Sequence, residues 1–441
     1  MNFLTASQLK ELFRQQCPYT SKGELIAEER RVTVLAANAN FPLEIYLHGL
    51  MRAAAHGAGS PLIIQLSQNA LRTIGGDPER LGLFTENRRS KPGSDLIYLT
   101  RGAKLAKGIL SVLQEQYQAP AVALALDHFR PPPFEPNPVT QEANTEQAGN
   151  KSPRTRGPKT VQGSRNPTGH ARKLIEQALD SVPTDLLQEH PGPKTVDGYV
   201  NYLTGVPYRN FKDGFIQAVT ILEPAWAMVD TADLPPVLNF AVTRDILISI
   251  RTSLGPRKVL LEAEFGAAAP EATRGSTSHA ASTGDLDKTA SPQEYAAWVE
   301  AFVVYTGTDA IAYPIGMAHG AKRGESHQPD LERLQAVQSR LFAQSGRYIP
   351  FVQHGGTGAA FLARGLVGKN NVNTYFMVAA MNAVANHATD FLHDIRNGEK
   401  SACGPDAYAK AIEAVTEAAL LKLRECRTYG KAPELAPIKD E

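Results

Sequence analysis

Cysteine is scarce in this chain: its 441 residues include three, Cys17, Cys403 and Cys426. They are scattered, form no CxxC pair and are odd in number, which argues against a disulfide framework and indicates a reducing compartment. Long hydrophobic runs are missing too, since no apolar stretch approaches the roughly 20 residues that cross a bilayer. The N-terminal stretch lacks the continuous hydrophobic block of a secretory signal. We therefore expect a soluble, cytoplasmic protein that does not insert into membranes.

An excess of charge of either sign is also missing. Lys and Arg number 46 and Asp and Glu number 45, which gives a formal net charge of +1. This balance does not favour binding to nucleic acid or to an anionic membrane surface. Hydrophobic residues make up 42% of the chain, which is enough for a sizeable core. The length fits one large barrel with insertions, or two ordinary domains.

Short apolar runs recur along the chain and are typical of buried parallel strands. There are eight of them: VTVLAAN (32–38), PLIIQLS (61–67), AVALALD (121–127), AWAMVD (225–230), KVLLEAEF (258–265), AIAYPIG (310–316), YIPFVQH (348–354) and NNVNTY (370–375). Helical patterns separate most of these runs, and strands that alternate with helices indicate a parallel sheet. Eight such units predict an α/β fold, a closed (β/α)8 TIM barrel, with an open doubly wound sheet as the alternative.

The first residues of the chain predict a short amphipathic helix. Leu9, Leu12 and Phe13 would share one face of it, and Thr5 or Ser7 could cap its start. We expect residues 1–441 to form a single barrel domain.

One segment, residues 131–195, departs from the pattern. Its first part, 131–168, contains almost no large apolar residues, so it cannot bury enough surface to offset the entropy of ordering. One helix is plausible near its end, over residues 171–182. We interpret 131–195 as a mobile insertion after the third strand. It could be a solvated loop without a role, a lid, or a partner-binding segment.

Polar residues at the carboxyl ends of the runs favour the barrel, because in a barrel these ends converge on the face that hosts the active site. In chain order they are Asn38, Ser67, Asp127, His128, Asp230, Glu264, His319, His354 and Asn373. Zinc prefers nitrogen or sulfur ligands with a carboxylate, and a catalytic zinc site keeps one position open. Three histidines and one glutamate fit this preference, so we predict a zinc site formed by His128, Glu264, His319 and His354.

Glycine-rich turns follow two of the histidines. His319 precedes Gly320, and His354 begins the sequence HGGTG. Glycine lets backbone N–H groups approach a ligand closely, and the loops after the seventh and eighth strands are a frequent phosphate site in barrels. We therefore predict a phosphate site in these loops. Its residues would be Gly355, Gly356 and Thr357, with Asn371, Asn373 and Thr374 from the sequence NVNT.

In these motifs the chain resembles the class II (metal-dependent) fructose-bisphosphate aldolases and their tagatose-bisphosphate relatives. The resemblance spans roughly residues 30–128 and 211–432. The motifs that carry it are ALDH (125–128), LEAEFG (261–266), IGMAHG (315–320), VQHGGTG (352–358) and NVNT (371–374), with AANAN, SPLIIQLS and AMVDTADLP as weaker matches and a C-terminal helical tail over 404–432.

The resemblance implies a reversible cleavage of a ketose phosphate, similar to fructose 1,6-bisphosphate, to dihydroxyacetone phosphate and an aldehyde through a metal-stabilised enediolate. It implies one catalytic zinc ion, room for a second cation, and a homo-oligomer, a dimer or tetramer. Asp127 would be the acid/base at the C4 hydroxyl, and Glu271 would move the proton at C3. Asn38, Ser67 and Gly320 would contact the substrate. None of the eight runs has a lysine near its carboxyl end, which favours the metal route over a lysine Schiff base.

The chain departs from the family pattern at its far end. Bisphosphate-cleaving members have an arginine after the proline of the tail, which holds the distal phosphate of a neighbouring subunit, and here Asp406 follows Pro405. Tyr375 stands where the family has an aspartate. Three alternatives follow: a class II aldolase with a different ketose, a non-catalytic relative, and a metal-dependent hydrolase on the same barrel. Metal-dependent hydrolases on this barrel usually have an HxH pair at the end of an early strand. Neither AANAN nor QLSQN, at the ends of the first two runs, provides one.

Overall fold

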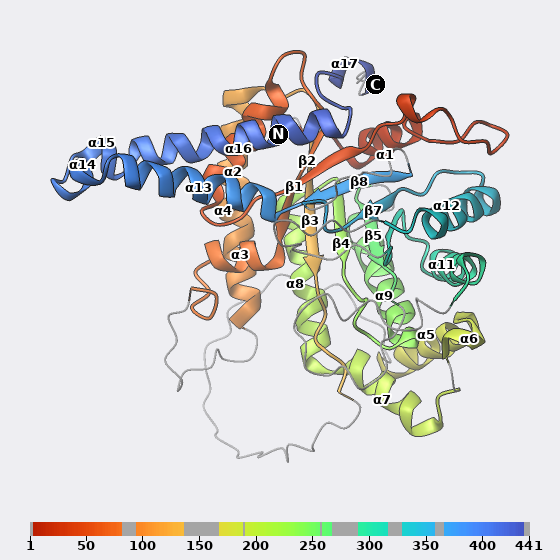
Figure 1. Ribbon diagram of the computed structural model, residues 1–441. Helices are drawn as coiled ribbons and strands as arrows, with labels where there is room; N and C mark the ends of the chain where they lie inside the picture. The colour runs from red at the N-terminus through yellow and green to blue at the C-terminus, as the bar shows by residue number, and fades with distance from the viewer. Residues whose placement is uncertain are drawn as a thin grey trace, which may run out of the picture.

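The computed structural model describes residues 3–81, 94–135, 167–187, 190–255, 258–266, 290–315, 329–357 and 366–435. Its centre is a closed barrel of eight parallel strands that neighbour one another in sequence order, with β1 pairing β8 (Figure 1). The strands are β1 (Val34–Asn38), β2 (Leu62–Ser67), β3 (Val122–Phe129), β4 (Trp226–Val229), β5 (Leu260–Glu264), β6 (Ala310–Ala312), β7 (Phe351–Gln353) and β8 (Val367–Val372). The predicted (β/α)8 barrel is confirmed, and each strand overlaps or adjoins the run that predicted it.

Helices surround the barrel and bury the outward-facing residues of the strands. The main ones are α2 (Leu43–Ala55), α4 (Ser94–Tyr117), α8 (Val206–Leu222), α9 (Pro236–Leu254), α11 (Pro292–Thr306), α12 (Leu331–Ser345) and α16 (Pro405–Glu425). Shorter elements are η1 (Glu28–Arg30), α3 (Gln68–Ile74) and α17 (Ala432–Leu435). Within the ranges given above, no helix is both long enough and apolar enough to cross a membrane.

The N-terminal helix closes one end of the barrel. It is α1 (Ala6–Gln15), and Thr5 caps it with a hydrogen bond from the Gln8 backbone N–H, as the sequence predicts. Leu9 and Phe13 are buried in a cluster with the first residues of the strands, among them Val34 and Trp226. These residues therefore form the floor of the barrel, at the end opposite the strands' carboxyl termini.

Removing a side chain from this floor is expected to destabilise the whole barrel. Leu9 is 0% exposed, so Leu9→Ala should lower the free energy of unfolding by about 2–5 kcal/mol through lost burial and a cavity. Urea unfolding measures this directly. Lys10→Ala, at an exposed position of the same helix, is the control and should stay within about 0.5 kcal/mol. Equal stability of both variants would show that α1 does not contribute to the core.

Part of the predicted insertion is packed structure. Residues 167–187 form α5 (Pro167–Ser181) and α6 (Thr184–Leu187), and α7 (Pro193–Thr204) follows. In α5, Leu174 and Ile175 are buried with the main core, and the Tyr305 hydroxyl of α11 donates to the Leu174 carbonyl at 3.1 Å. The helix predicted at 171–182 is thus present and docked, and the expectation of mobility does not extend to it. Residues 136–166 lie outside the described ranges.

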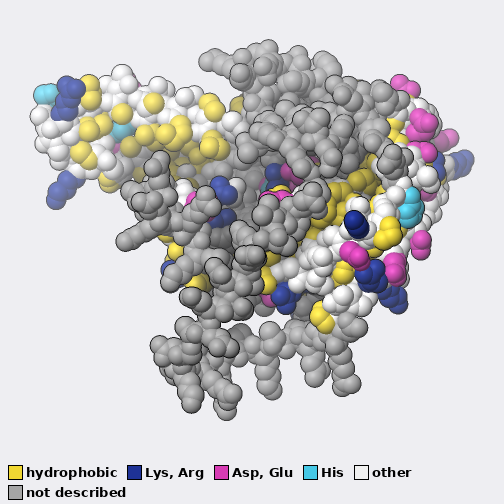
Figure 2. Space-filling view, turned by 90° about the horizontal axis from the view of Figure 1, so that it is seen from below, with side chains coloured by type: hydrophobic (Ala, Val, Ile, Leu, Met, Phe, Trp, Pro, Cys, Tyr) yellow, Lys and Arg dark blue, Asp and Glu magenta, His cyan; other side chains and the backbone are white. Residues whose placement is uncertain are grey.

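The last helices form an arm that projects from the barrel. It consists of α13 (Thr374–Asp390), α14 (Leu392–Arg396), α15 (Lys400–Cys403) and α16, with α13 and α16 side by side and α14 and α15 at the tip (Figure 1). Figure 2 shows hydrophobic side chains gathered along this arm. Several are large and 40–59% exposed: Met377, Val378, Met381, Phe391 and Leu392. The arm therefore presents an apolar surface that this protomer does not cover.

Candidate active site

The carboxyl end of β3 brings Asp127 and His128 to the same place. Regular strand geometry would send consecutive side chains to opposite faces. Here the pairing of β3 with β4 shifts register between Leu126 and Phe129, and His128 adopts a φ of 48°. Such a φ is uncommon for a residue other than glycine, and it turns the chain out of regular strand geometry at this point. As a result, Asp127 Oδ2 and His128 Nδ1 lie 2.7 Å apart.

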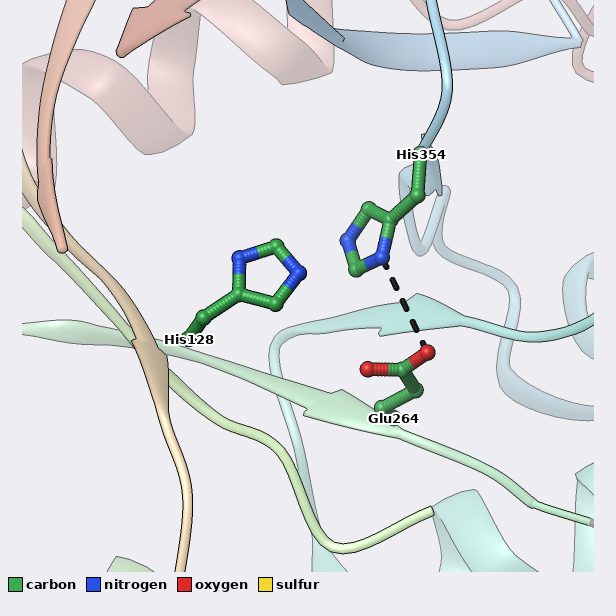
Figure 3. Close-up of side chains that lie close together, drawn as sticks. All are labelled: His128, Glu264 and His354. Carbon is green, nitrogen blue, oxygen red and sulfur yellow. Dashed lines mark ion pairs between the residues drawn. The ribbon is translucent and has the colours of Figure 1, made fainter. Parts of the chain in front are cut away.

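Three of the four predicted metal ligands meet at the barrel mouth. His128 of β3, Glu264 at the end of β5 and His354 directly after β7 offer ligand atoms that all lie within 4.8 Å of one another. Figure 3 shows the two imidazoles and the carboxylate facing a common point, with His354 Nδ1 at 3.7 Å from Glu264 Oε1. Two nitrogens and one oxygen in this arrangement fit a zinc site. The fourth predicted ligand, His319, lies outside the described residues, as does Gly320.

The charges around this point also fit a cation. Burial raises the pKa of Glu264 well above its usual range, and the neighbouring Asp230 adds to the rise. Burial acts the same way on Asp230, but Arg130 outweighs it and holds the pKa of Asp230 at about 2. Burial lowers the pKa of His128, but the surrounding carboxylates, Asp127 first, outweigh it and raise the pKa to about 10. The cluster thus attracts positive charge, which protons or a divalent cation can supply.

Asp127 is a fully buried carboxylate with a fixed orientation. Asn38 Nδ2 donates to its Oδ2 and Gln65 Nε2 to its Oδ1, both at 2.8 Å. Burial tends to raise the pKa of this carboxyl, but His128 and, to a lesser extent, Lys369 hold it well below its usual range. Asp127 is therefore an ionised, oriented group that can accept a proton from a hydroxyl placed next to it.

Two charged residues inside the barrel were missed by the sequence reasoning. Lys369 of β8 and Glu262 of β5 are both 0% exposed, and Lys369 Nζ lies 2.6 Å from Glu262 Oε2. Strand β8 begins at Val367, three residues before the predicted run, so Lys369 lies in the strand but outside that run. The missed signal was the period of two: Glu262 precedes Glu264, and Lys369 precedes Asn371, by two residues on one face. Lys369 is not among the residues that line the cavity, so it is not placed to form a Schiff base with a substrate bound there.

A cavity of about 790 Å³ extends from Asp127 and His128 to the loops after β7 and β8. Most of the predicted substrate residues line it: Asn38, Ser67, Gly355, Thr357, Asn371, Asn373 and Thr374. Asn371 is 7% exposed, and neither of its side-chain amide atoms has a hydrogen-bond partner among the described residues. Buried polar groups are normally paired, so an amide left open beside a cavity suits a polar ligand.

Gly356 holds the loop after β7 closely against β8. Its N–H donates to the Asn371 carbonyl at 3.1 Å, and a Cβ placed on it would lie 2.2 Å from Asn370 Oδ1. Gly356 is not among the residues that line the cavity, and its predicted contact with phosphate stays a prediction. The predicted proton-transfer residue, Glu271, lies outside the described ranges.

Three arginines also line the cavity, at the side away from the glycine loop: Arg72, Arg80 and Arg130. Arg72 pairs with Asp77 at 2.6 Å, and Arg130 pairs with Asp230 and with Asp233. Arg80 is exposed and makes no ion pair with the residues described in the structure. The sequence reasoning did not single out these residues, because arginines in loops carry no positional signal without the fold.

Comparison with known proteins agrees with this geometry. Residues 218–431 match the family model described as "Fructose-bisphosphate aldolase class-II". The resemblance to class II aldolases is thereby confirmed. The matched segment of this chain includes Glu264, His354 and the NVNT sequence. It extends from the end of α8 through the helical arm. No curated protein sequence matches the chain.

A solved structure shares the fold of this chain along nearly its whole length. The fructose-bisphosphate aldolase from Campylobacter jejuni has 15% sequence identity, covers 98% of this chain and 97% of its own, and superposes with a TM-score of 0.57. The YdjI aldolase from Escherichia coli K12 (16% identity, 92% and 95% covered, TM-score 0.44) is also similar. So is a putative fructose-1,6-biphosphate aldolase from Coccidioides immitis (17% identity, 92% and 95% covered, TM-score 0.46).

Proposed function

We propose that this protein is a zinc-dependent class II aldolase that reversibly cleaves a ketose phosphate to dihydroxyacetone phosphate and an aldehyde. The observation that carries the proposal is the convergence of His128, Glu264 and His354 beside a buried, ionised Asp127. His319 is proposed as the fourth ligand. The cavity next to this cluster ends in a loop that contains glycine and amide donors, as a phosphate site requires.

The residues of the chain would divide the reaction between them. In cleavage, Asp127 accepts the proton of the C4 hydroxyl as the C3–C4 bond breaks, and the C4 carbon leaves as the aldehyde. In condensation the same carboxyl returns that proton. Glu271 is proposed to move the proton at C3 of the three-carbon product. When bound, zinc supplies the positive charge that polarises the ketone and stabilises the negative charge left by the broken bond.

The phosphate is proposed to lie between the loop after β7 and the end of β8. Gly355, Thr357 and Asn371 line the cavity there, with Asn373 and Thr374 at the start of α13. A helix N-terminus carries partial positive charge and favours an anion. Asn38 and Ser67, across the cavity, are proposed to contact the sugar. Asn38 also orients Asp127, so it would link substrate contact to the acid/base group.

The loop after β7 is expected to depend on the absence of a side chain at position 356. Gly356→Ala would place a Cβ against Asn370 Oδ1 and within 2.7 Å of the Asn371 carbonyl, so the loop must move away from β8. We expect KM for the phosphorylated substrate to rise about tenfold or more, which corresponds to a loss of about 1.4 kcal/mol of binding. Steady-state kinetics measure this. Gly108→Ala, where a Cβ meets nothing within 4 Å, is the control. An unchanged KM in Gly356→Ala would contradict the phosphate placement.

The far end of the substrate is proposed to meet arginines of this chain. Asp406 stands in the first turn of α16, which begins at the tip of the projecting arm (Figure 1). Asp406 is therefore remote from the cavity of its own protomer. Its negative charge also repels a phosphate, where the arginine of the family would attract one. Arg80 and Arg130 line the cavity and offer donors for an anionic or polyhydroxylated end. These donors suit either a bisphosphate or a different phosphorylated sugar.

We further propose that the protein is a homo-oligomer. Large apolar side chains are exposed on α13 and α14 and gather along the arm, and apolar patches of this kind are typical of protein–protein interfaces. Burying this arm against another copy would remove it from water. The mass in solution, measured by light scattering, is expected to be a multiple of 47.7 kDa. A monomer at micromolar concentration would contradict this proposal.

A panel of substrates tests the activity. Fructose 1,6-bisphosphate, tagatose 1,6-bisphosphate and ketose monophosphates are supplied to the zinc-loaded protein, and dihydroxyacetone phosphate is detected with a coupled reductase. We expect release from at least one of them, its loss on chelation and its return with added zinc. Hydrolysis to inorganic phosphate alone would favour the hydrolase. No reaction with any member would favour a non-catalytic relative.

A further inference from the structure

Glu262 lies at the centre of a buried array that the proposed chemistry does not use. It is 0% exposed, two residues before the proposed ligand Glu264, on the inner face of the barrel. Trp226 Nε1 and Lys369 Nζ both donate to its Oε2, each at 2.6 Å. Its other oxygen, Oε1, lies 3.4 Å from His354 Nε2.

We propose that Glu262 is a positioning residue for the metal site, which holds the His354 ring and selects its tautomer. The inference rests on the proposed function only in taking His354 as a metal ligand. Glu262 accepts the hydrogen of Nε2, so the lone pair of the imidazole is on Nδ1. A ligating histidine commonly donates its other N–H to a carboxylate, which fixes the ring and raises its basicity.

The two nitrogens of His354 face two different carboxylates, and these contacts determine which nitrogen is turned toward the metal cluster. Nε2 faces Glu262 Oε1, and Nδ1 faces Glu264 Oε1 at 3.7 Å. In Figure 3 the dashed line joins Nδ1 to Glu264, and the His128 ring lies beside the His354 ring, with the two ring centroids 4.7 Å apart. The nitrogen that keeps its lone pair therefore faces Glu264 of the metal cluster, and the nitrogen that carries the hydrogen faces the buried Glu262.

Glu262 is itself held in place from the floor of the barrel. Both donors to Oε2 are fixed, because Lys369 is fully buried in β8 and the Trp226 ring packs against Phe13 of α1 with ring centroids 5.3 Å apart. Lys369 Nζ also lies 5.0 Å above the Trp226 ring. With Oε2 occupied by two donors, Oε1 is the oxygen left for His354. A chain of contacts thus runs from the N-terminal helix to the proposed ligand.

Cobalt binding tests the inference without any substrate. Removing Glu262 alone would leave Lys369 as an unpaired buried charge, which is strongly destabilising, so both charges are removed together in the double variant Glu262→Met, Lys369→Met. We expect its affinity for Co²⁺, measured by competition with a chelator, to fall about 10- to 100-fold, with an altered visible spectrum. Glu262→Gln with Lys369→Met restores an acceptor oxygen and should recover part of the affinity.

The matched control removes an ion pair outside the metal cluster. Lys212 and Asp245 pair at 2.8 Å between α8 and α9, so Lys212→Met with Asp245→Asn should keep the wild-type cobalt affinity and spectrum. Circular dichroism and thermal unfolding verify that each variant is folded. A folded Glu262→Met, Lys369→Met variant with wild-type cobalt affinity and spectrum would overturn the inference.

Two further outcomes separate this inference from the proposed function. If His354→Ala abolishes cobalt binding and the Glu262 variant also weakens it, the inference holds even when no ketose phosphate is cleaved. If His354→Ala leaves cobalt binding intact, His354 is not a ligand and the inference fails. Should the Glu262 variant not fold, a crystal structure of the cobalt-loaded wild type decides: Nδ1 of His354 on the metal with Nε2 bonded to Glu262 supports it, and Nε2 on the metal overturns it.

Discussion

Replacing Asp127 by asparagine is expected to lower kcat by about 10²- to 10⁴-fold, the usual contribution of a general acid/base, while the protein keeps its metal. The carboxylate is fully buried, and the neighbouring His128 holds its pKa low, so it is ionised and ready to accept a proton at neutral pH. Asparagine has nearly the same shape but cannot accept that proton. Steady-state kinetics of cleavage, together with the zinc content of the purified variant, separate loss of chemistry from loss of metal.

Asp245→Asn is the matched control for this variant. Asp245 is also a buried carboxylate, and it accepts hydrogen bonds from Tyr208 and Lys212 on the outside of the barrel. Its replacement should leave kcat unchanged. Normal turnover in Asp127→Asn would show that Asp127 only orients its neighbours, and the acid/base assignment would then be wrong.

Removing the imidazole of His354 is expected to abolish both zinc binding and turnover. The ligand atoms of His128, Glu264 and His354 lie within 4.8 Å of one another, so losing one opens the cluster to water. Loss of a group that only supports a ligand costs about 10- to 100-fold in metal affinity, and loss of a ligand itself should cost more. Metal analysis of His354→Ala after dialysis, and a zinc titration with a competing chelator, measure the effect.

A second buried histidine provides the comparison. His387 lies in α13 and bonds the Ala402 carbonyl through Nε2 at 3.0 Å, within the arm. His387→Gln should retain wild-type zinc content. Tight, stoichiometric zinc in a folded His354→Ala variant would remove His354 from the ligand set and with it the proposed metal site.

The barrel could be predicted from the sequence because most of its strands lie in short apolar runs, with polar residues at or just after their carboxyl ends. Burial on both faces requires such runs, and convergence of their carboxyl ends brings residues as distant as His128 and His354 together. The amphipathic spacing of Leu9, Leu12 and Phe13 likewise predicted the helix that closes the barrel. His319, Gly320 and Glu271 remain predictions, since they lie outside the described residues.

Other parts of the site could not be derived from the sequence, for physical reasons. Glu262 and Lys369 are 107 residues apart, and only the closed barrel shows that each neutralises the other. The turn of the backbone at His128 depends on a local shift in strand pairing, which no residue type in that run signals. Outside the site, helix α5 was predicted but its docking through Leu174 and Ile175 was not, because the polar segment before it indicated mobility for the whole insertion.

Exchange of a proton on dihydroxyacetone phosphate tests the central claim most directly, because it needs no knowledge of the aldehyde. The zinc-loaded protein is incubated with dihydroxyacetone phosphate in deuterium oxide, and the C3 protons are followed by proton NMR. We expect incorporation of deuterium at C3, its loss on chelation of the metal, and its return when zinc is added back. Folded, zinc-loaded protein that catalyses no exchange at C3 would contradict the assignment of this site to a class II aldolase reaction.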